Sequence, residues 1–119
     1  MSKSSKDKGT PVVKEYVFAC TLADFGEKLS HRVKVGDKTI LLLRKQGTGQ
    51  IFAIDNKCPH RGYPLHKSEA IEIIDGALCI TCPAHSLKLN VETGLGLDST
   101  KKQKRYRVEI RESEVWVRP

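Results

Sequence analysis

Two short stretches, Cys58-Pro59-His60 and Cys82-Pro83-Ala84-His85, carry most of the information in this chain. Each stretch pairs one thiol with one imidazole and places a proline directly after the cysteine. Thiolates and neutral imidazoles are common ligands of metals in proteins. Proline fixes φ and removes a backbone donor, which stiffens each turn. The two stretches therefore predict one metal centre, with four candidate ligands: Cys58, His60, Cys82 and His85.

Length and composition are those of one small globular domain. The chain has 119 residues, of which 39% are hydrophobic and 29% are charged, as is ordinary for a soluble protein. No apolar run approaches the ~18 residues that a membrane helix needs. The N-terminal lysines are not followed by an apolar stretch, as a secretory signal would require. We therefore expect a cytoplasmic protein without a membrane span.

The positive charge is unevenly distributed along the chain. The formal net charge is +7, and residues 101–107 contain five basic side chains and no acidic one. A basic surface steers an acidic protein partner, attaches to nucleic acid or is simply solvated. The sequence does not decide between these interpretations for segment 101–107, and we expect no nucleic-acid partner.

Turn signals divide the chain into hairpins. Residues 1–11 are polar and lysine-rich and are expected to form a disordered tail, which leaves residues 12–119 as the domain. Repeated hairpins without a lasting helical stripe predict an all-β sandwich or small barrel. The expected strands cover residues 16–20, 33–35, 39–44, 50–54, 71–74, 78–81, 105–110 and 115–117, with a short helical turn within residues 22–30.

The order C-x-H followed by C-x-x-H resembles the Rieske iron–sulfur family. Arg61-Gly62-Tyr63-Pro64-Leu65 is similar to the family's first cluster loop, and residues 85–94 are similar to its second loop. The resemblance implies a Rieske-like β-sandwich with a small cluster-binding subdomain, whose loops cover about residues 56–68 and 80–90. It also implies one [2Fe–2S] cluster per chain. Two cysteines would hold one iron and two histidines the other.

The resemblance also implies a function in electron transfer. Two thiolates balance the charge of the oxidised core, so a centre completed by neutral imidazoles accepts an electron readily. We expect a carrier that passes single electrons from a reductase to an oxygenase or similar enzyme, with no catalytic residues. His60 and Cys82 are separated by 21 residues. This spacing is longer than in bacterial ferredoxins of this class and is similar to the soluble Rieske domain-containing proteins of eukaryotes.

Two other functions remain open at this point. Small subunits of nitrite reductase share the fold that the resemblance implies. In addition, Cys79-x-x-Cys82 is itself a metal-binding spacing, and with Cys58 and His85 it would complete a zinc site in a binding module. Against zinc, Cys79 and Cys20 both fall in expected strands, where a buried core cysteine is the commoner outcome.

The remaining histidines and aromatic residues suggest no second site. His31 and His66 lack partners at ligand spacing, and we expect His66 at the surface. Tyr106 and Trp116 fall in the last expected hairpin, where packing in the core or at an edge is the simplest interpretation.

We predict a midpoint potential in the lower half of the family range, which runs from roughly −150 to +300 mV. High-potential members carry a disulfide between the loops and hydroxyl donors to the cluster. The matching positions here are Tyr63 and Ala84 for the cysteines, and Leu87 and Leu89 for the hydroxyls. Fewer hydrogen bonds to the sulfurs stabilise the added electron less. A redox titration checks this prediction, and a midpoint above about +150 mV would contradict it.

Overall fold

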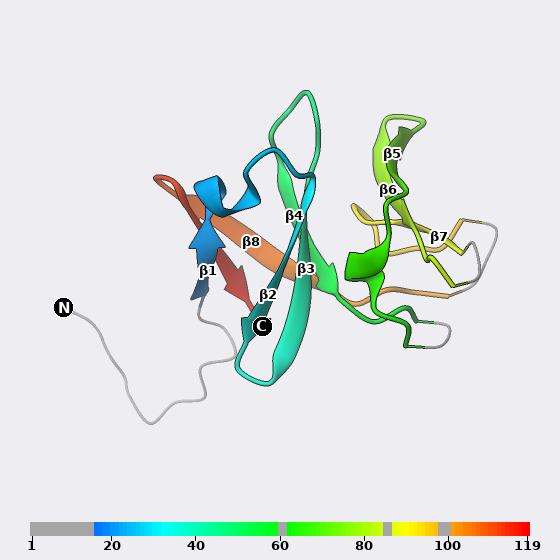
Figure 1. Cartoon of the computed structure of the whole chain (residues 1–119), viewed down its shortest axis with the longest axis horizontal. Coiled ribbons are helices and arrows are strands. Elements are labelled where there is room, and N and C mark those ends of the chain that lie inside the picture. The colour runs from blue at the N-terminus through cyan, green and yellow to red at the C-terminus, as the bar shows by residue number, and fades with distance from the viewer. Residues whose placement is uncertain (1–15, 60–61, 85–86, 98–100) are drawn as a thin grey trace.

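The computed structural model describes residues 16–59, 62–84, 87–97 and 101–119 (Figure 1). The expected tail, residues 1–11, lies outside these ranges. The described elements, in chain order, are β1 (Val17–Thr21), η1 (Leu22–Phe25), β2 (Ser30–Val35), β3 (Lys38–Arg44), β4 (Ile51–Asp55), η2 (Leu65–Lys67), β5 (Ile71–Ile74), β6 (Ala77–Thr81), β7 (Lys88–Asn90), β8 (Arg105–Arg111) and β9 (Glu114–Arg118).

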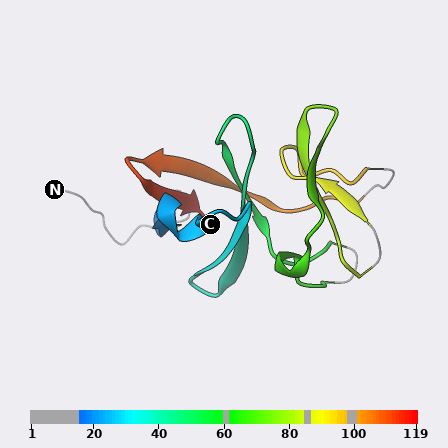
Figure 2. The same ribbon diagram turned by 45° about the horizontal axis from the view of Figure 1, so that its top comes forward.

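The strands form two antiparallel sheets of unequal size. The large sheet has the order β1-β9-β8-β4-β3-β2, and the small sheet has the order β5-β6-β7. The large sheet curls until its edge strands β1 and β2 come close together, so that it is nearly a barrel. The small sheet stands to one side of it in both views (Figures 1 and 2). The prediction of an all-β base with a small subdomain is confirmed.

Strand β3 is buried on both faces. Its run Ile40-Leu41-Leu42-Leu43 is almost completely inaccessible to solvent. Successive side chains of a strand point to opposite faces, and accordingly Ile40 and Leu42 belong to one apolar cluster whereas Leu41 and Leu43 belong to another. A continuous apolar run is what a strand covered on both sides requires. β3 therefore separates two hydrophobic cores.

The first core fills the curled sheet, and the second core lies between that sheet and the small one. The first core consists of Cys20, Phe25, Val33, Val35, Ile40, Leu42, Ile51, Ala53, Tyr106, Val115 and Val117. The second core consists of Leu41, Leu43, Ile54, Cys58, Leu65, Leu78, Ile80, Cys82, Leu89 and Val91. Two of the four candidate metal ligands are thus members of the second core.

A polar contact also ties the small sheet to the large one. The ammonium of Lys45, just after β3, lies 2.8 Å from Glu92 Oε2 and donates to the Gly76 carbonyl at 2.8 Å. The same Glu92 oxygen accepts the Leu78 amide at 2.7 Å. The hydrogen bond from Lys45 holds the pKa of Glu92 below its usual value, with a smaller contribution from the Leu78 amide. Glu92 is therefore held as a carboxylate between the two sheets.

The short elements were the ones that the sequence did not predict. The eight expected strands and the helical turn are present, with most boundaries moved by one or two residues. β7 has only three residues and η2 has a single turn, so neither presents enough residues for a periodic pattern. β7 forms because the chain returns beside β6, where Ile80 pairs with Leu89.

We predict that Ile80→Ala lowers the free energy of unfolding by ~2–5 kcal/mol, because it opens a cavity in the second core. Ile80 is 0% exposed, whereas Ile73 on the neighbouring strand is 45% exposed. The matched variant Ile73→Ala is expected to change stability by less than about 0.5 kcal/mol. Urea denaturation measures both values, and equal losses would show that the second core does not stabilise the fold.

Candidate metal centre

Loop 1, residues 56–68, begins at the end of β4 and carries Cys58. The Cys58 amide donates to the Tyr63 carbonyl at 2.9 Å, and the Gly62 amide donates back to the Cys58 carbonyl at 2.7 Å. Gly62 has a φ of +72°, a conformation that favours glycine. These two bonds fix the backbone of Cys58 against that of Gly62 and Tyr63.

Loop 2, residues 80–90, continues β6 and carries Cys82. The Cys82 amide donates to the Leu87 carbonyl at 2.8 Å, directly beyond the last β6–β7 pair, Thr81 and Lys88. The loop is therefore the closed end of a hairpin within the small sheet. Cys82 is therefore held directly after the last residue of β6 that pairs with β7.

The fold brings the two candidate cysteines into one apolar environment. Cys58 is 2% exposed and Cys82 is 1% exposed, and both belong to the second core. Burying a thiolate in apolar surroundings is costly unless a metal supplies positive charge. This donor pair therefore fits a metal–sulfur centre. The other two candidate ligands, His60 and His85, lie outside the described residues.

Gln103 fastens the basic segment to loop 1. Its side chain is 6% exposed, and its amide nitrogen donates to the carbonyls of Asp55 and, at 2.9 Å, Lys57. The Asp55 amide donates to the Lys104 carbonyl at 2.9 Å. Segment 101–107 is thus part of the support of loop 1 as well as a basic surface. Sequence reasoning missed this role, because no local pattern shows which carbonyls a glutamine will meet.

Asn56 and His66 hold the two ends of loop 1 together. The Asn56 carbonyl accepts the Leu65 amide at 2.7 Å, and its side-chain oxygen accepts the His66 amide at 2.8 Å. The His66 ring lies 2.8 Å from Asn56 Nδ2 and 3.1 Å from Arg32 Nη1. Burial lowers the pKa of His66, and the charges of Arg32 and Lys67 lower it further. The His66 ring, which we expected at the surface, is half-buried and also supports loop 1.

Cys79 does not join the two loop cysteines. It is buried, as predicted, and its thiol donates to the Ala77 carbonyl at 3.6 Å. Strand alternation places it on the opposite face of β6 from Ile80, which belongs to the second core. Among the described residues, no group of metal-ligating side chains includes Cys79. This placement argues against the zinc site that used Cys79 together with Cys82.

Comparison with known proteins agrees with this geometry. Residues 15–110 match the sequence pattern of the family described as Rieske [2Fe–2S] domain. The chain belongs to that family. It is 36% identical over 89 residues to a human Rieske domain-containing protein, covering 73% of this chain and 55% of that protein. The chain thus spans about half the length of this relative. The prediction of a Rieske domain similar to the eukaryotic proteins is confirmed.

Solved structures share this Rieske fold. One described as a complex of reduced oxygenase and oxidized ferredoxin in carbazole 1,9a-dioxygenase gives a TM-score of 0.69 at 28% identity, covering 87% of this chain and 92% of that one. A putative nitrite reductase NADPH small subunit gives a TM-score of 0.76 at 19% identity, covering 86% and 96%, and shows the fold alone. In the described ranges no helix is long and apolar enough to cross a membrane.

We predict that Gln103→Leu destabilises the Rieske domain by ~1–3 kcal/mol, because the Asp55 and Lys57 carbonyls lose a donor at a buried position. The exposed neighbour Lys102 offers a control, and Lys102→Ala should stay within about 0.5 kcal/mol of the parent. Chemical denaturation of both variants measures the difference. If Gln103→Leu unfolds at the same denaturant concentration as the control, the amide does not support loop 1.

Proposed function

We propose that this chain is a one-electron carrier whose [2Fe–2S] cluster is held by Cys58 and Cys82 on one iron and by His60 and His85 on the other. The observation that supports it most is that both loop cysteines belong to one buried apolar cluster. They come from different sheets, and thiols deep in an apolar core suit a metal–sulfur group. Such a group, when bound, accepts and returns single electrons.

The residues of the chain provide the enclosure. Leu41, Leu65 and Leu89 belong to the same core as both cysteines and exclude water from the sulfur side. The backbone amides of Cys58 and Cys82 donate to carbonyls of their own loops, which fixes the backbone at both cysteines. The structure around a rigid, water-free site rearranges little when the charge of the centre changes. A small rearrangement favours rapid electron exchange.

We propose a reductase as the electron donor and an oxygenase or similar redox enzyme as the acceptor. The ferredoxin in the oxygenase complex, which resembles this chain along most of its length, supports this assignment. The net charge of +7 suits acidic partner surfaces.

We assign no substrate chemistry to the chain itself. The free, buried thiols of Cys20 and Cys79 suit the reducing cytoplasm.

A second candidate function is that of a small subunit in a nitrite-reductase-like complex. The TM-score of 0.76 with such a subunit favours it on fold alone. Affinity purification of the native protein separates the two functions, because a subunit remains with a large enzyme through gel filtration whereas a carrier elutes alone.

We predict that the purified protein contains about two irons and two labile sulfides per chain, and that Cys58→Ser and Cys82→Ser lose both. Cys79→Ser is a matched control, because Cys79 is also buried but lies outside the second core. It should keep its iron and its visible absorption. Iron and sulfide analysis with absorption spectra checks the set. A colourless wild-type protein after anaerobic reconstitution would contradict the proposal.

The histidines need a separate test. His60→Gln and His85→Gln should each lose the cluster or change its reduced-state EPR spectrum, because an iron loses an imidazole ligand. His31→Gln is the control, since His31 lies on β2 and packs against Phe25 of the first core. Reductive titration of the wild type should take up about one electron per cluster. Unchanged spectra in both ligand variants would remove the histidines from the proposed centre.

A further inference from the structure

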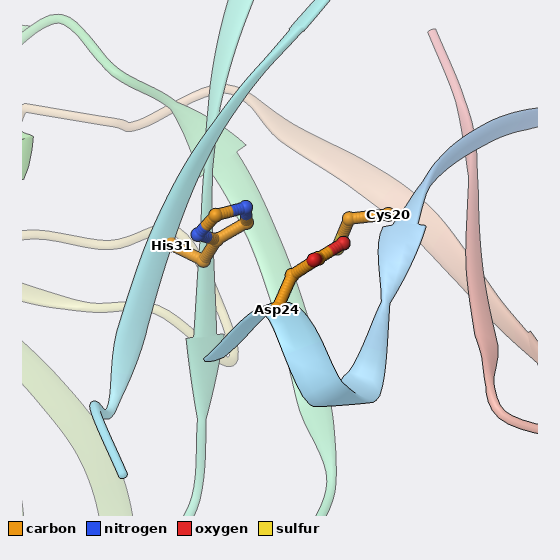
Figure 3. Close-up of side chains that lie close together, drawn as sticks. All are labelled: Cys20, Asp24 and His31. Carbon is orange, nitrogen blue, oxygen red and sulfur yellow. The ribbon is translucent and has the colours of Figure 1, made fainter. Parts of the chain in front are cut away.

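A second group of metal-ligating side chains lies between β1 and β2 of the large sheet. Cys20, Asp24 and His31 place one ligand atom each within 4.8 Å of the others (Figure 3). They come from β1, η1 and β2. β2 also contacts η2 of loop 1, but Cys20, the buried member of the group, belongs to the first core, whereas Cys58 and Cys82 belong to the second core. The group is therefore separate from the proposed iron–sulfur centre.

A β-bulge directs Cys20 toward this group. Phe18 pairs with Trp116, but Cys20 pairs with Val115, so Ala19 is an extra residue in β1. A bulge of this kind re-aims the side chains that follow it. As a result Cys20 is only 4% exposed and belongs to the first core.

The other two side chains are already fixed in place. Asp24 Oδ2 accepts the Thr21 amide at 2.9 Å, which orients the carboxylate at the start of η1. The His31 ring packs against the Phe25 ring at a centroid distance of 5.6 Å. Phe25 is in turn covered by the Arg44 guanidinium, 5.0 Å from the ring centroid. A metal site whose ligands are held by their neighbours loses little entropy on binding.

The chemistry of the three donors favours zinc. One thiolate, one imidazole and one carboxylate are all ligands of Zn²⁺, and three protein ligands leave a fourth position for water. Exposure increases from Cys20, which is buried, through His31 to Asp24, which is exposed. A cation can therefore enter from solvent on the side of Asp24. A nucleophilic role for Cys20 fits less well, because a substrate would have to reach a buried sulfur.

We propose that Cys20, Asp24 and His31 form a zinc site that links the two edge strands of the large sheet. β1 and β2 are the two edge strands of that sheet. A metal bound by Cys20 on β1 and His31 on β2 joins edges that share no ladder hydrogen bonds. Edge strands are the parts of a sheet that most need covering or pairing. Zinc would thus complete the barrel and stabilise the folded state in proportion to its binding.

The experiment titrates zinc chloride into protein that retains its iron and sulfide, using calorimetry against a competing chelator. We expect about one zinc per chain in addition to the iron, and a melting temperature that rises with zinc concentration. His31→Gln and Asp24→Asn should each weaken binding at least ~tenfold. Asp24→Asn keeps an oxygen that can accept the Thr21 amide, so loss of that hydrogen bond does not account for the expected weaker zinc binding.

Control variants and an iron measurement show whether zinc binds at Cys20, Asp24 and His31. Asp37→Asn and Cys79→Ser change the same residue types outside the group and should bind zinc as the wild type does. Iron content is measured in every sample, so zinc that displaces iron at loops 1 and 2 is recognised. The proposal is overturned if no saturable zinc binding occurs with the cluster in place. It is also overturned if His31→Gln and Asp24→Asn bind zinc as tightly as the wild type.

Discussion

The burial of β3 on both faces is the constraint on which the rest of the structure depends. Leu41 and Leu43 face the second core, and Ile40 and Leu42 face the first. Because one strand serves both cores, the small sheet cannot move relative to the curled sheet without exposing apolar side chains to water. Loop 1 leaves the neighbouring strand β4, and loop 2 leaves β6 of the small sheet. The position of each loop relative to the other is therefore set by the packing around β3.

The same packing sets the electrostatics of the proposed centre. A thiolate in a core lined by Leu65 and Leu89 has no nearby solvent to stabilise it, so its charge has to be balanced by a metal. Two such thiolates balance an oxidised [2Fe–2S] core, and neutral imidazoles add no charge. A centre of low net charge is one that an apolar enclosure tolerates. The apolar core and the proposed mixed ligand set are therefore compatible, because the ligand set keeps the net charge of the centre low.

Much of this architecture could be predicted from local sequence, and the failures have a common cause. Hairpins such as β5–β6 and β8–β9 follow from apolar runs and turn residues that are adjacent in the chain. Gln103 and Asn56 were missed as supports of loop 1, because their partners are set by the fold. The contacts of His66 were not predicted for the same reason, since Arg32, which lies near its ring, is on β2. Sequence spacing predicts what one loop can present, but not what two distant segments share.

The zinc proposal extends this reasoning to ligands that no spacing rule could find. Cys20 and His31 lie close together because the large sheet curls and brings its edge strands, β1 and β2, side by side. Cys20 has the carboxylate of Asp24 beside it and no second cysteine in its group, whereas Cys58 and Cys82 share one apolar core. A single thiolate beside a carboxylate suits a borderline cation such as Zn²⁺, whereas paired thiolates in an apolar core suit an iron–sulfur group. Donor type therefore assigns a different metal to each of the two proposed sites.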